Sequence, residues 1–560
     1  MQTSKAWLIY NQACFVDSIF ERLVSENNSL TSPTKNAYNN KDAVHVGKRF
    51  KIFILMINRK VCMAQSDSPL LLAIDQGTTS SRAILFTPQG EIKSVCQQEL
   101  TLSYPQSGWV EQDPEALWQD TLQVCREVLQ TSPSAISDTV AIGITNQRET
   151  TVVWDKQSGE PVYNAIVWQD RRTAAVCDEL IAQGQAVTVS AKTGLLLDPY
   201  FSATKIAWIL DNVKGVRKKA EAGQLLFGTI DTFLLWRLTE GRVHATDATN
   251  ASRTLLLNIA TGQWDDELLA LFNIPRSMLP EVRDNVSDFG VVAKSLLGAE
   301  LPICAMIGDQ QAALVGQACF DTGMIKSTYG TGCFMLMNLG SEPVTSTQRL
   351  VTTIAYQLNG KITYALEGSI FIAGAAIQWL RDGLALFDHA SKSEGMAKSL
   401  DGNDGVYFVP ALTGLGAPYW RPDVRGAIMG LGRDSTSAHI ARAALEAQAY
   451  QTRDLVTAMK ADIDASPAVI RADGGLVVNQ FVCQFLADIL QLQIEVPAVT
   501  EATAWGAASL AGVGAGVFVG TEDIADVWQK RQDYMPVMSE GEAEKLYAGW
   551  QQAVKGLIGE

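Results

Sequence analysis

The chain has 560 residues, too many for a single hydrophobic core, so we expect two or more domains. Its hydrophobic content of 47% and charged content of 19% are typical of a globular protein and exclude a disordered one. The formal net charge of −15 argues against nucleic-acid binding, which needs a basic surface.

Cysteine and histidine usage excludes further classes. The nine cysteines form no Cys-x-x-Cys pair, which indicates reduced thiols of a cytoplasmic protein, without a zinc site or a disulfide framework. None of the four histidines has metal-ligand spacing. We therefore do not expect metal or triad chemistry based on histidine.

The first residues differ from the rest. We predict that residues 1–68 are an N-terminal extension that is disordered or non-native, because residues 1–62 are basic overall whereas the chain is acidic. The apolar run Ile52–Ile57 is far shorter than the roughly 20 residues of a membrane helix, so no membrane span is expected. We hypothesise that Met63 is the natural start.

The first clear elements surround the octet Asp75–Arg82. It lies between the apolar runs Leu70–Ile74 and Ala83–Phe86, which predicts a strand, a tight polar turn and a strand. The turn contains Gly77, which allows backbone to approach a ligand, and hydroxyls that suit phosphate oxygens. Asp75 could hold Mg²⁺ directly or through water. The alternative is an ordinary polar hairpin turn.

A helix and a second strand follow. Asp113 precedes Pro114 and Glu115, a combination typical of a helix start. The apolar run Val140–Ile144 then predicts a strand that ends at Arg148-Glu149. This adjacent donor and acceptor suit a small polyol, and the alternative is a surface ion pair.

Asp309 is the candidate catalytic residue. It follows the apolar strand Ile303–Ile307, at the end where open α/β sheets place their ligand sites. A carboxylate there can accept a proton from an attacking hydroxyl, although Asp also favours a helix N-cap. Trp168 and Phe334 could cover the apolar edge of a substrate, with core packing as the alternative.

The pattern restarts near residue 320. The segments Met324–Thr328 and Cys333–Met337 flank the turn Tyr329–Gly332, as the strands flank Asp75–Arg82, which implies two similar domains around a cleft. A third glycine turn, Asp473–Gly475, precedes an expected helix at Asn479–Leu490. No P-loop or protein-kinase motif occurs, so three glycine turns could surround one nucleotide instead.

One glycine-rich segment is expected to have no ligand role. Gly512–Gly516 looks like a dinucleotide fingerprint, but it lacks the preceding strand and the acidic residue downstream. We interpret it as close helix or loop packing.

Together these segments resemble the FGGY carbohydrate kinases, most closely the members that act on glycerol, from about Leu70 to the C-terminus. The segments that carry the resemblance are Asp75–Arg82, Asn146–Thr150, Tyr200–Trp208, Gly308–Gln311, Tyr329–Phe334, Gly426–Glu446 and Asp473–Asn479. Relatives that act on sugars differ at Arg148-Glu149, which favours glycerol over xylulose or gluconate.

The resemblance implies an α/β fold with two ribonuclease-H-like domains of the actin-like ATPase type around a central nucleotide cleft. Residues 69–318 would bind glycerol and phosphate, and residues 319–560 would bind the nucleotide. The reaction would transfer the γ-phosphoryl group of ATP to glycerol, giving sn-glycerol 3-phosphate and ADP in glycerol catabolism. A cytoplasmic homodimer or homotetramer would be expected.

The resemblance also implies roles for individual residues. Asp309 would be the general base, and Asp75 would support Mg²⁺. The residues expected to hold glycerol are Arg148, Glu149, Trp168, Tyr200, Asp309, Gln310 and Phe334. Those expected to bind ATP or ADP are Thr78, Thr79, Ser80, Arg82, Thr331, Gly374, Gln378, Gly475 and Asn479.

The sequence leaves alternative functions open and bears on how the enzyme would be regulated. A kinase for another polyol or ketose, or an actin- or chaperone-like ATPase scaffold, would share the fold. Some family members bind fructose 1,6-bisphosphate through a glycine–arginine loop before the Asp309 strand, and here Glu300 replaces the arginine, so weak or absent inhibition is expected. Residues 284–302 contain no histidine, so control by histidine phosphorylation is not expected either.

Overall fold

A computed structural model describes residues 69–559 except 422, 464–466 and 468. The predicted extension over residues 1–68, including Met63, lies outside the described residues. Within them, no helix is long and apolar enough to cross a membrane.

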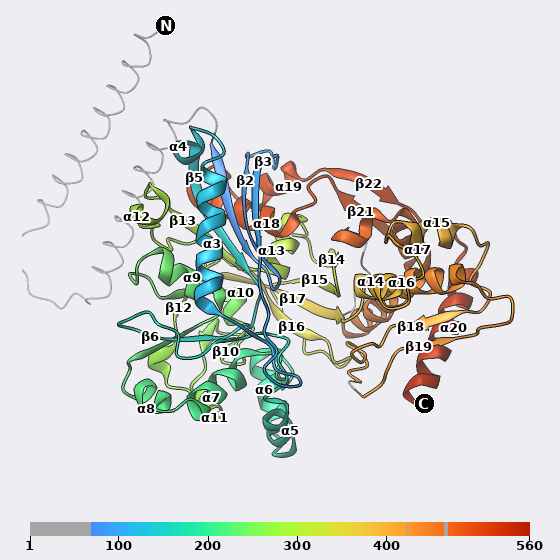
Figure 1. The fold of residues 1–560 in the computed structure, drawn as a ribbon, viewed down its shortest axis with the longest axis horizontal. Coiled ribbons are helices and arrows are strands. Elements are labelled where there is room, and N and C mark those ends of the chain that lie inside the picture. Colours follow the sequence, from blue (N-terminus) through green and yellow to red (C-terminus); the bar gives the residue numbers. More distant parts are fainter. Residues whose placement is uncertain (1–68, 422, 464–466, 468, 560) are drawn as a thin grey trace, which may run out of the picture. The chain divides into compact units, whose positions relative to one another are not determined.

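The first sheet has the strand order β13-β5-β1-β2-β3 (Figure 1). Its strands are β1 (Leu70–Gln76), β2 (Ser80–Phe86), β3 (Ile92–Glu99), β5 (Thr139–Asn146) and β13 (Ile303–Gly308). Strand β1 is antiparallel to β2 and parallel to β5, which is parallel to β13. The apolar runs of β1, β5 and β13 are almost wholly buried, which is why the sequence predicted these strands.

The turn between β1 and β2 is shorter than predicted. Asp75 pairs with Arg82 and Gln76 with Ser81 in the sheet, so the turn is Gly77–Thr79, and the Gly77 amide donates to the Ser80 carbonyl at 2.8 Å. The strands extend into the polar octet because alternate residues still face the core. The side chains of Asp75 and Arg82 are consequently held on a sheet and not on a flexible loop.

The second sheet repeats the first. Its order is β16-β17-β15-β14-β20-β21-β22, and the run β17-β15-β14-β20-β21 has the same order and directions as β3-β2-β1-β5-β13. The strands are β14 (Ile325–Tyr329), β15 (Cys333–Gly340), β16 (Val351–Leu358), β17 (Lys361–Ile370), β20 (Val469–Asp473), β21 (Gln493–Pro497) and β22 (Lys530–Tyr534). The predicted restart near residue 320 is therefore a structural duplication, and the fold class is confirmed.

Helices flank the sheets. Those of the first half are α3 (Pro114–Leu129), α4 (Ala135–Asp138), α5 (Ala174–Ala182), α6 (Ala186–Thr193), α7 (Ser202–Asn212), α8 (Val216–Glu221), α9 (Ile230–Leu238), α10 (Ala248–Ala251), α11 (Asp266–Leu271), α12 (Lys294–Leu297) and α13 (Asp309–Gly316). Those of the second half are α14 (Gly374–Asp382), α15 (Lys392–Lys398), α16 (Ser437–Asp462), α17 (Gln480–Leu490), α18 (Ala502–Ala515), α19 (Thr521–Val527) and α20 (Glu540–Ile558). Helix α3 begins as predicted, with Asp113 accepting from the Glu115 amide at 2.8 Å.

The other short strands are β4 (Glu111–Gln112), β6 (Val152–Asp155), β7 (Ala165–Ile166), β8 (Leu225–Gly228), β9 (Ala245–Asp247), β10 (Leu257–Asn258), β11 (Gln263–Trp264), β12 (Glu281–Arg283), β18 (Tyr407–Val409) and β19 (Ala427–Met429), and two 3₁₀ helices are η1 (Arg276–Met278) and η2 (Gly475–Val478).

Helix α18 packs onto the first sheet although it belongs to the second half of the sequence (Figure 1). A Cβ atom on Gly506 would lie 1.9 Å from the Ala312 carbonyl oxygen of α13, and one on Gly143 would lie 2.1 Å from that of Ala507. Glycine is required at both contacts because the backbones touch. The Gly512–Gly516 segment spans the last turn of α18 and its C-cap. Cβ atoms on Gly512 and Gly514 would lie 2.7 Å from Phe518 and 2.8 Å from Cys304, which confirms the packing interpretation.

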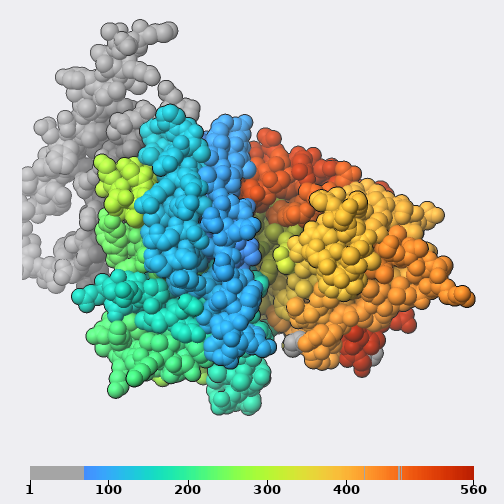
Figure 2. Space-filling view, in the orientation of Figure 1, coloured from blue at the N-terminus to red at the C-terminus, as the bar shows by residue number. Residues whose placement is uncertain are grey.

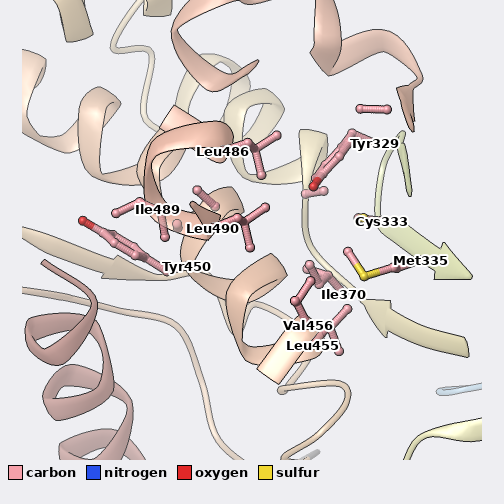
Figure 3. Close-up of a cluster of buried hydrophobic side chains, with 14 of the residues drawn as sticks. Tyr329, Cys333, Met335, Ile370, Tyr450, Leu455, Val456, Leu486, Ile489 and Leu490 are labelled. Atoms are coloured by element: carbon pink, nitrogen blue, oxygen red, sulfur yellow. The ribbon is translucent and has the colours of Figure 1, made fainter. Parts of the chain in front are cut away.

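The second sheet rests on α16 and α17. Figure 3 shows Tyr329, Met335 and Ile370 from the sheet with apolar side chains of these helices. The Tyr329 and Thr452 hydroxyls share a hydrogen bond of 2.8 Å, which ties the end of β14 to α16. This core fixes the position of the glycine turn that follows Tyr329.

Candidate active site

Three parallel strands of the first sheet end at the same edge. The register pairs Gln76 of β1 with Asn146 of β5, and Asn146 with Gly308 of β13. The residues that follow these ends are Arg148, Glu149 and Asp309, and Asp75 lies one position earlier on β1. Figure 2 shows a hollow between the blue strands of the first half and the yellow and orange elements of the second.

Asp309 is the first residue of α13, after the N-cap Gly308. Its Oδ1 accepts from the Gln310 amide at 2.7 Å and lies 3.1 Å from Arg148 Nε. Its side chain is 29% exposed, and burial of the remainder raises the pKa of this carboxyl against the opposing charges of Arg148 and Lys326. A reachable carboxylate with a raised pKa is suited to general-base chemistry.

Arg148 and Glu149 belong to a buried ring of four charges, so the surface ion-pair alternative is wrong. Arg148 donates to Glu367 from Nη1 at 2.6 Å and from Nη2 at 3.3 Å. Arg253 donates to Glu367 at 2.8 Å and to Glu149 at 2.7 Å, and Arg148 Nε lies 3.9 Å from Glu149. All four side chains are at most 5% exposed.

The ring joins the two halves, because Glu367 lies on β17 and the other three residues lie in the first half. Burial by itself raises the pKa of Glu367, but Arg148 and Arg253 together lower it to about 2. Glu367 and Arg253 were not found from the sequence. Their signal was weak: a single acidic residue inside the otherwise uncharged stretch 362–370, and an arginine next to the buried α10.

Aromatic side chains line the site beside this ring. The Trp168 ring lies edge-on to Tyr200 at 5.5 Å and to Phe334 at 6.3 Å between centroids. All three are partly exposed, so simple core packing does not describe them. Trp168 Nε1 donates to Thr78 Oγ1 at 2.8 Å, which connects this wall to the turn Gly77–Thr79.

Neighbouring amides hold that turn. Gln147 donates to the Gly77 carbonyl at 3.2 Å and Gln112 to the Thr78 carbonyl at 2.7 Å. Thr79 is exposed and Ser80 is partly exposed.

Arg82 links Asp75 to the second half of the chain. It forms ion pairs with Asp75 and, at 2.6 Å, with Glu501 at the N-cap of α18. Burial raises the pKa of Asp75, whereas Arg82 opposes the shift.

The predicted nucleotide residues of the second half come from three segments that touch. The Gly374 amide donates to the Gly330 carbonyl at 2.9 Å, and the Ala373 amide donates to the Thr331 carbonyl at 2.9 Å. Gly474, with φ of +94°, is so close to Tyr329 that a Cβ atom would lie 2.4 Å from its carbonyl oxygen. The turn after β14, the start of α14 and the turn after β20 are therefore one unit.

The remaining predicted residues lie around this unit. Gln378 is exposed one helical turn after Gly374, and Gly475 faces open space. Asn479 is the N-cap of α17, where its Oδ1 accepts from the Val482 amide at 3.2 Å. The predicted residues thus lie near the strand ends of both sheets, and Phe334 of the second sheet contacts Trp168 of the first half.

The fold and this site define a kinase built on the actin-like ATPase fold. Residues 70–316 match the N-terminal domain of the FGGY family of carbohydrate kinases, and residues 325–515 match its C-terminal domain. The chain belongs to this family.

Named relatives are similar over nearly their whole length. Glycerol kinase of Nitrosomonas eutropha is 61% identical over 88% of this chain and 99% of its own. Glycerol kinase 1 of Pseudomonas aeruginosa is 59% identical over 88% of this chain and 100% of its own. The crystal structure of Plasmodium falciparum glycerol kinase with ADP has a TM-score of 0.83 and 36% identity, covering 88% of this chain and 98% of that one.

Proposed function

We propose that this enzyme transfers the γ-phosphoryl group of ATP to glycerol, giving sn-glycerol 3-phosphate and ADP. The observation that carries the proposal is the position of Asp309, 3.1 Å from Arg148 and at the same sheet edge as the turn Gly77–Thr79. The named relatives, which are glycerol kinases, support the same substrate pair.

Glycerol needs hydrogen-bond donors and acceptors at each hydroxyl, and a cover for its carbon edge. Arg148 and Gln310 supply donors, while Glu149 and Asp309 supply acceptors. The rings of Trp168, Tyr200 and Phe334, already in mutual contact, would cover the carbon atoms. This set of donors, acceptors and apolar rings suits a short polyol.

In the chemical step, Asp309 accepts the proton of a terminal glycerol hydroxyl as its oxygen attacks the γ-phosphorus of ATP. The new O–P bond forms while the bond from the γ-phosphorus to the bridging oxygen breaks, and ADP leaves with that electron pair. Arg148 holds the base in place through Nε. Closure of the two halves would exclude water, which competes with glycerol as the nucleophile.

The nucleotide would lie against the glycine turns of both halves. Thr78, Thr79, Ser80 and Arg82 would meet the phosphates from the first half. Thr331, Gly374, Gln378, Gly475 and Asn479 would line the rest of the site. In Asn479 the Oδ1 atom caps α17, so its Nδ2 group is available to donate to the nucleotide.

Asp75 fits Mg²⁺ as a single supporting carboxylate. The described residues contain no cluster of three or more His, Cys, Asp or Glu side chains that could hold a metal. Mg²⁺ is commonly held by one or two carboxylates together with water and substrate phosphates, and Asp75, which pairs with Arg82 in this structure, would supply one of them. Bound Mg²⁺ would neutralise charge on the phosphates, and chelation with EDTA should abolish turnover until Mg²⁺ is restored.

We further propose that residues 69–318 and 319–560 act as the glycerol-binding and nucleotide-binding domains. The repeated strand order of the two sheets supports this division. Helix α18 is the exception, since it crosses back onto the first sheet.

The test is ADP formation from ATP with a panel of glycerol, longer polyols, xylulose and gluconate. We expect the highest kcat/KM with glycerol, and phosphorus NMR should identify sn-glycerol 3-phosphate as the product. A higher kcat/KM with a ketose would contradict glycerol as the substrate. ATP hydrolysis that does not depend on any added polyol would instead indicate an ATPase scaffold.

A further inference from the structure

Lys326 is a fully buried lysine that none of the roles above uses. It lies on β14, and its side chain reaches from the second half of the chain to α13 of the first half. A lysine is almost never fully buried unless its charge has partners. Its partners therefore indicate what it does.

The Lys326 ammonium donates to two groups of the proposed glycerol site. One acceptor is Gln310 Oε1, and the other is the Phe334 carbonyl oxygen at 3.2 Å. Burial lowers the pKa of Lys326, whereas the nearby carboxylates of Asp473 and Asp309 favour the charged form. All of these neighbours are hydrogen-bond acceptors or carboxylates, so they favour the charged ammonium form of Lys326.

This contact fixes which way the Gln310 amide points. An ammonium carries donors and no acceptor, so the amide atom that faces it must be oxygen. The Nε2 group of Gln310 is then left to donate elsewhere. Gln310 directly follows Asp309 and its side chain is only partly buried, so its Nε2 group would be able to reach a polyol bound at Asp309.

We propose that Lys326 is a positioning residue that holds Gln310 as a hydrogen-bond donor to a glycerol hydroxyl. This inference rests on the proposed function. It assigns a direction to one hydrogen bond: the substrate oxygen accepts from Gln310, whereas Glu149 and Asp309 accept from the substrate. The same ammonium fixes the backbone that carries the Phe334 ring.

A double-mutant cycle with Lys326→Met and Gln310→Ala tests the proposal. Each single variant should raise the KM for glycerol about 10-fold, which corresponds to one lost hydrogen bond, and leave the KM for ATP within about two-fold. The double variant should be no worse than the single variants, because Lys326 acts through Gln310. Multiplying effects, or an equal rise in the KM for ATP, would overturn the proposal.

Gln310→Glu is the second test, and it holds even if Lys326→Met fails to fold. A carboxylate keeps and strengthens the contact with Lys326 but removes the Nε2 donor. We expect the same rise of about 10-fold in the KM for glycerol, with a thermal stability no lower than that of the wild type. An unchanged KM for glycerol would overturn the proposal.

The wild-type enzyme separates this proposal from the proposed function. If it uses another polyol better than glycerol, the proposed substrate is wrong. The double-mutant cycle is then measured with that polyol. A double variant no worse than the single variants still supports the role of Lys326, and multiplying effects still overturn it.

Discussion

Glu367→Gln perturbs the one carboxylate that binds both buried arginines of the ring. Glu367 accepts three hydrogen bonds, at 2.6, 2.8 and 3.3 Å, from Arg148 and Arg253, and it is 5% exposed. Removing one partner of a buried ion pair costs about 3–5 kcal/mol, and the amide can still accept from one guanidinium. We therefore expect a loss of about 3 kcal/mol in the free energy of unfolding.

The same change should impair catalysis. With its Nη contacts to residue 367 weakened, Arg148 keeps the 3.2 Å hydrogen bond from Nη1 to Gln311 but is less constrained, so it can turn further toward Asp309 and displace the base from its working position. A displacement of about 1 Å can cost about 100-fold in rate, so we expect a loss of that order in kcat/KM for glycerol.

The assay combines urea unfolding with steady-state kinetics. Thr353→Val is the matched control, because Thr353 and Ser252 also join the two halves, through a buried hydrogen bond of 3.0 Å. The free energy of unfolding of the control should fall by about 1 kcal/mol, and its kcat/KM for glycerol should equal that of the wild type. If Glu367→Gln were as mild as the control in both measurements, the ring would not have the role assigned to it.

Three further predictions concern pH, backbone and control. Burial raises the pKa of Asp309, and the base acts when it is unprotonated. The value of kcat/KM should therefore fall with decreasing pH, with a midpoint above 3.8, the ordinary pKa of an aspartic acid. A midpoint at or below 3.8 would contradict this prediction. Gly474→Ala should unfold at lower urea concentration, since its φ is +94° and Tyr329 blocks a Cβ, whereas Gly475→Ala should keep wild-type stability but raise the KM for ATP; equal stability of both variants would refute the packing argument. Fructose 1,6-bisphosphate at millimolar concentration should not inhibit, because the exposed Glu300 repels it, and strong inhibition would overturn this expectation.

The strands and the sheet edge of the site could be predicted because their signals are local. Apolar runs such as Ile303–Ile307 are buried on both faces, and a polar residue directly after such a run lies at the edge where parallel strands end. This rule is enough to assign Asp309 and Arg148 to the same edge from the amino-acid sequence.

The partners of these residues could not be predicted, because they are distant in the sequence. Glu367 follows Arg148 by 219 positions, and Lys326 lies on a strand of the other half from Gln310. The return of α18 to the first sheet depends on the backbone contacts of Gly506 and Gly143, which the sequence did not identify. The residue roles, the domain boundaries, a cytoplasmic location and a homodimer or homotetramer stay predictions.

The most direct measurement compares Asp309→Asn with the wild type. The substitution keeps the shape of the side chain but removes the base, so kcat with saturating glycerol and ATP should fall by about 10²- to 10⁴-fold while calorimetry shows unchanged ADP affinity. Wild-type turnover in this variant would contradict the assignment of Asp309 as the group that takes the glycerol proton.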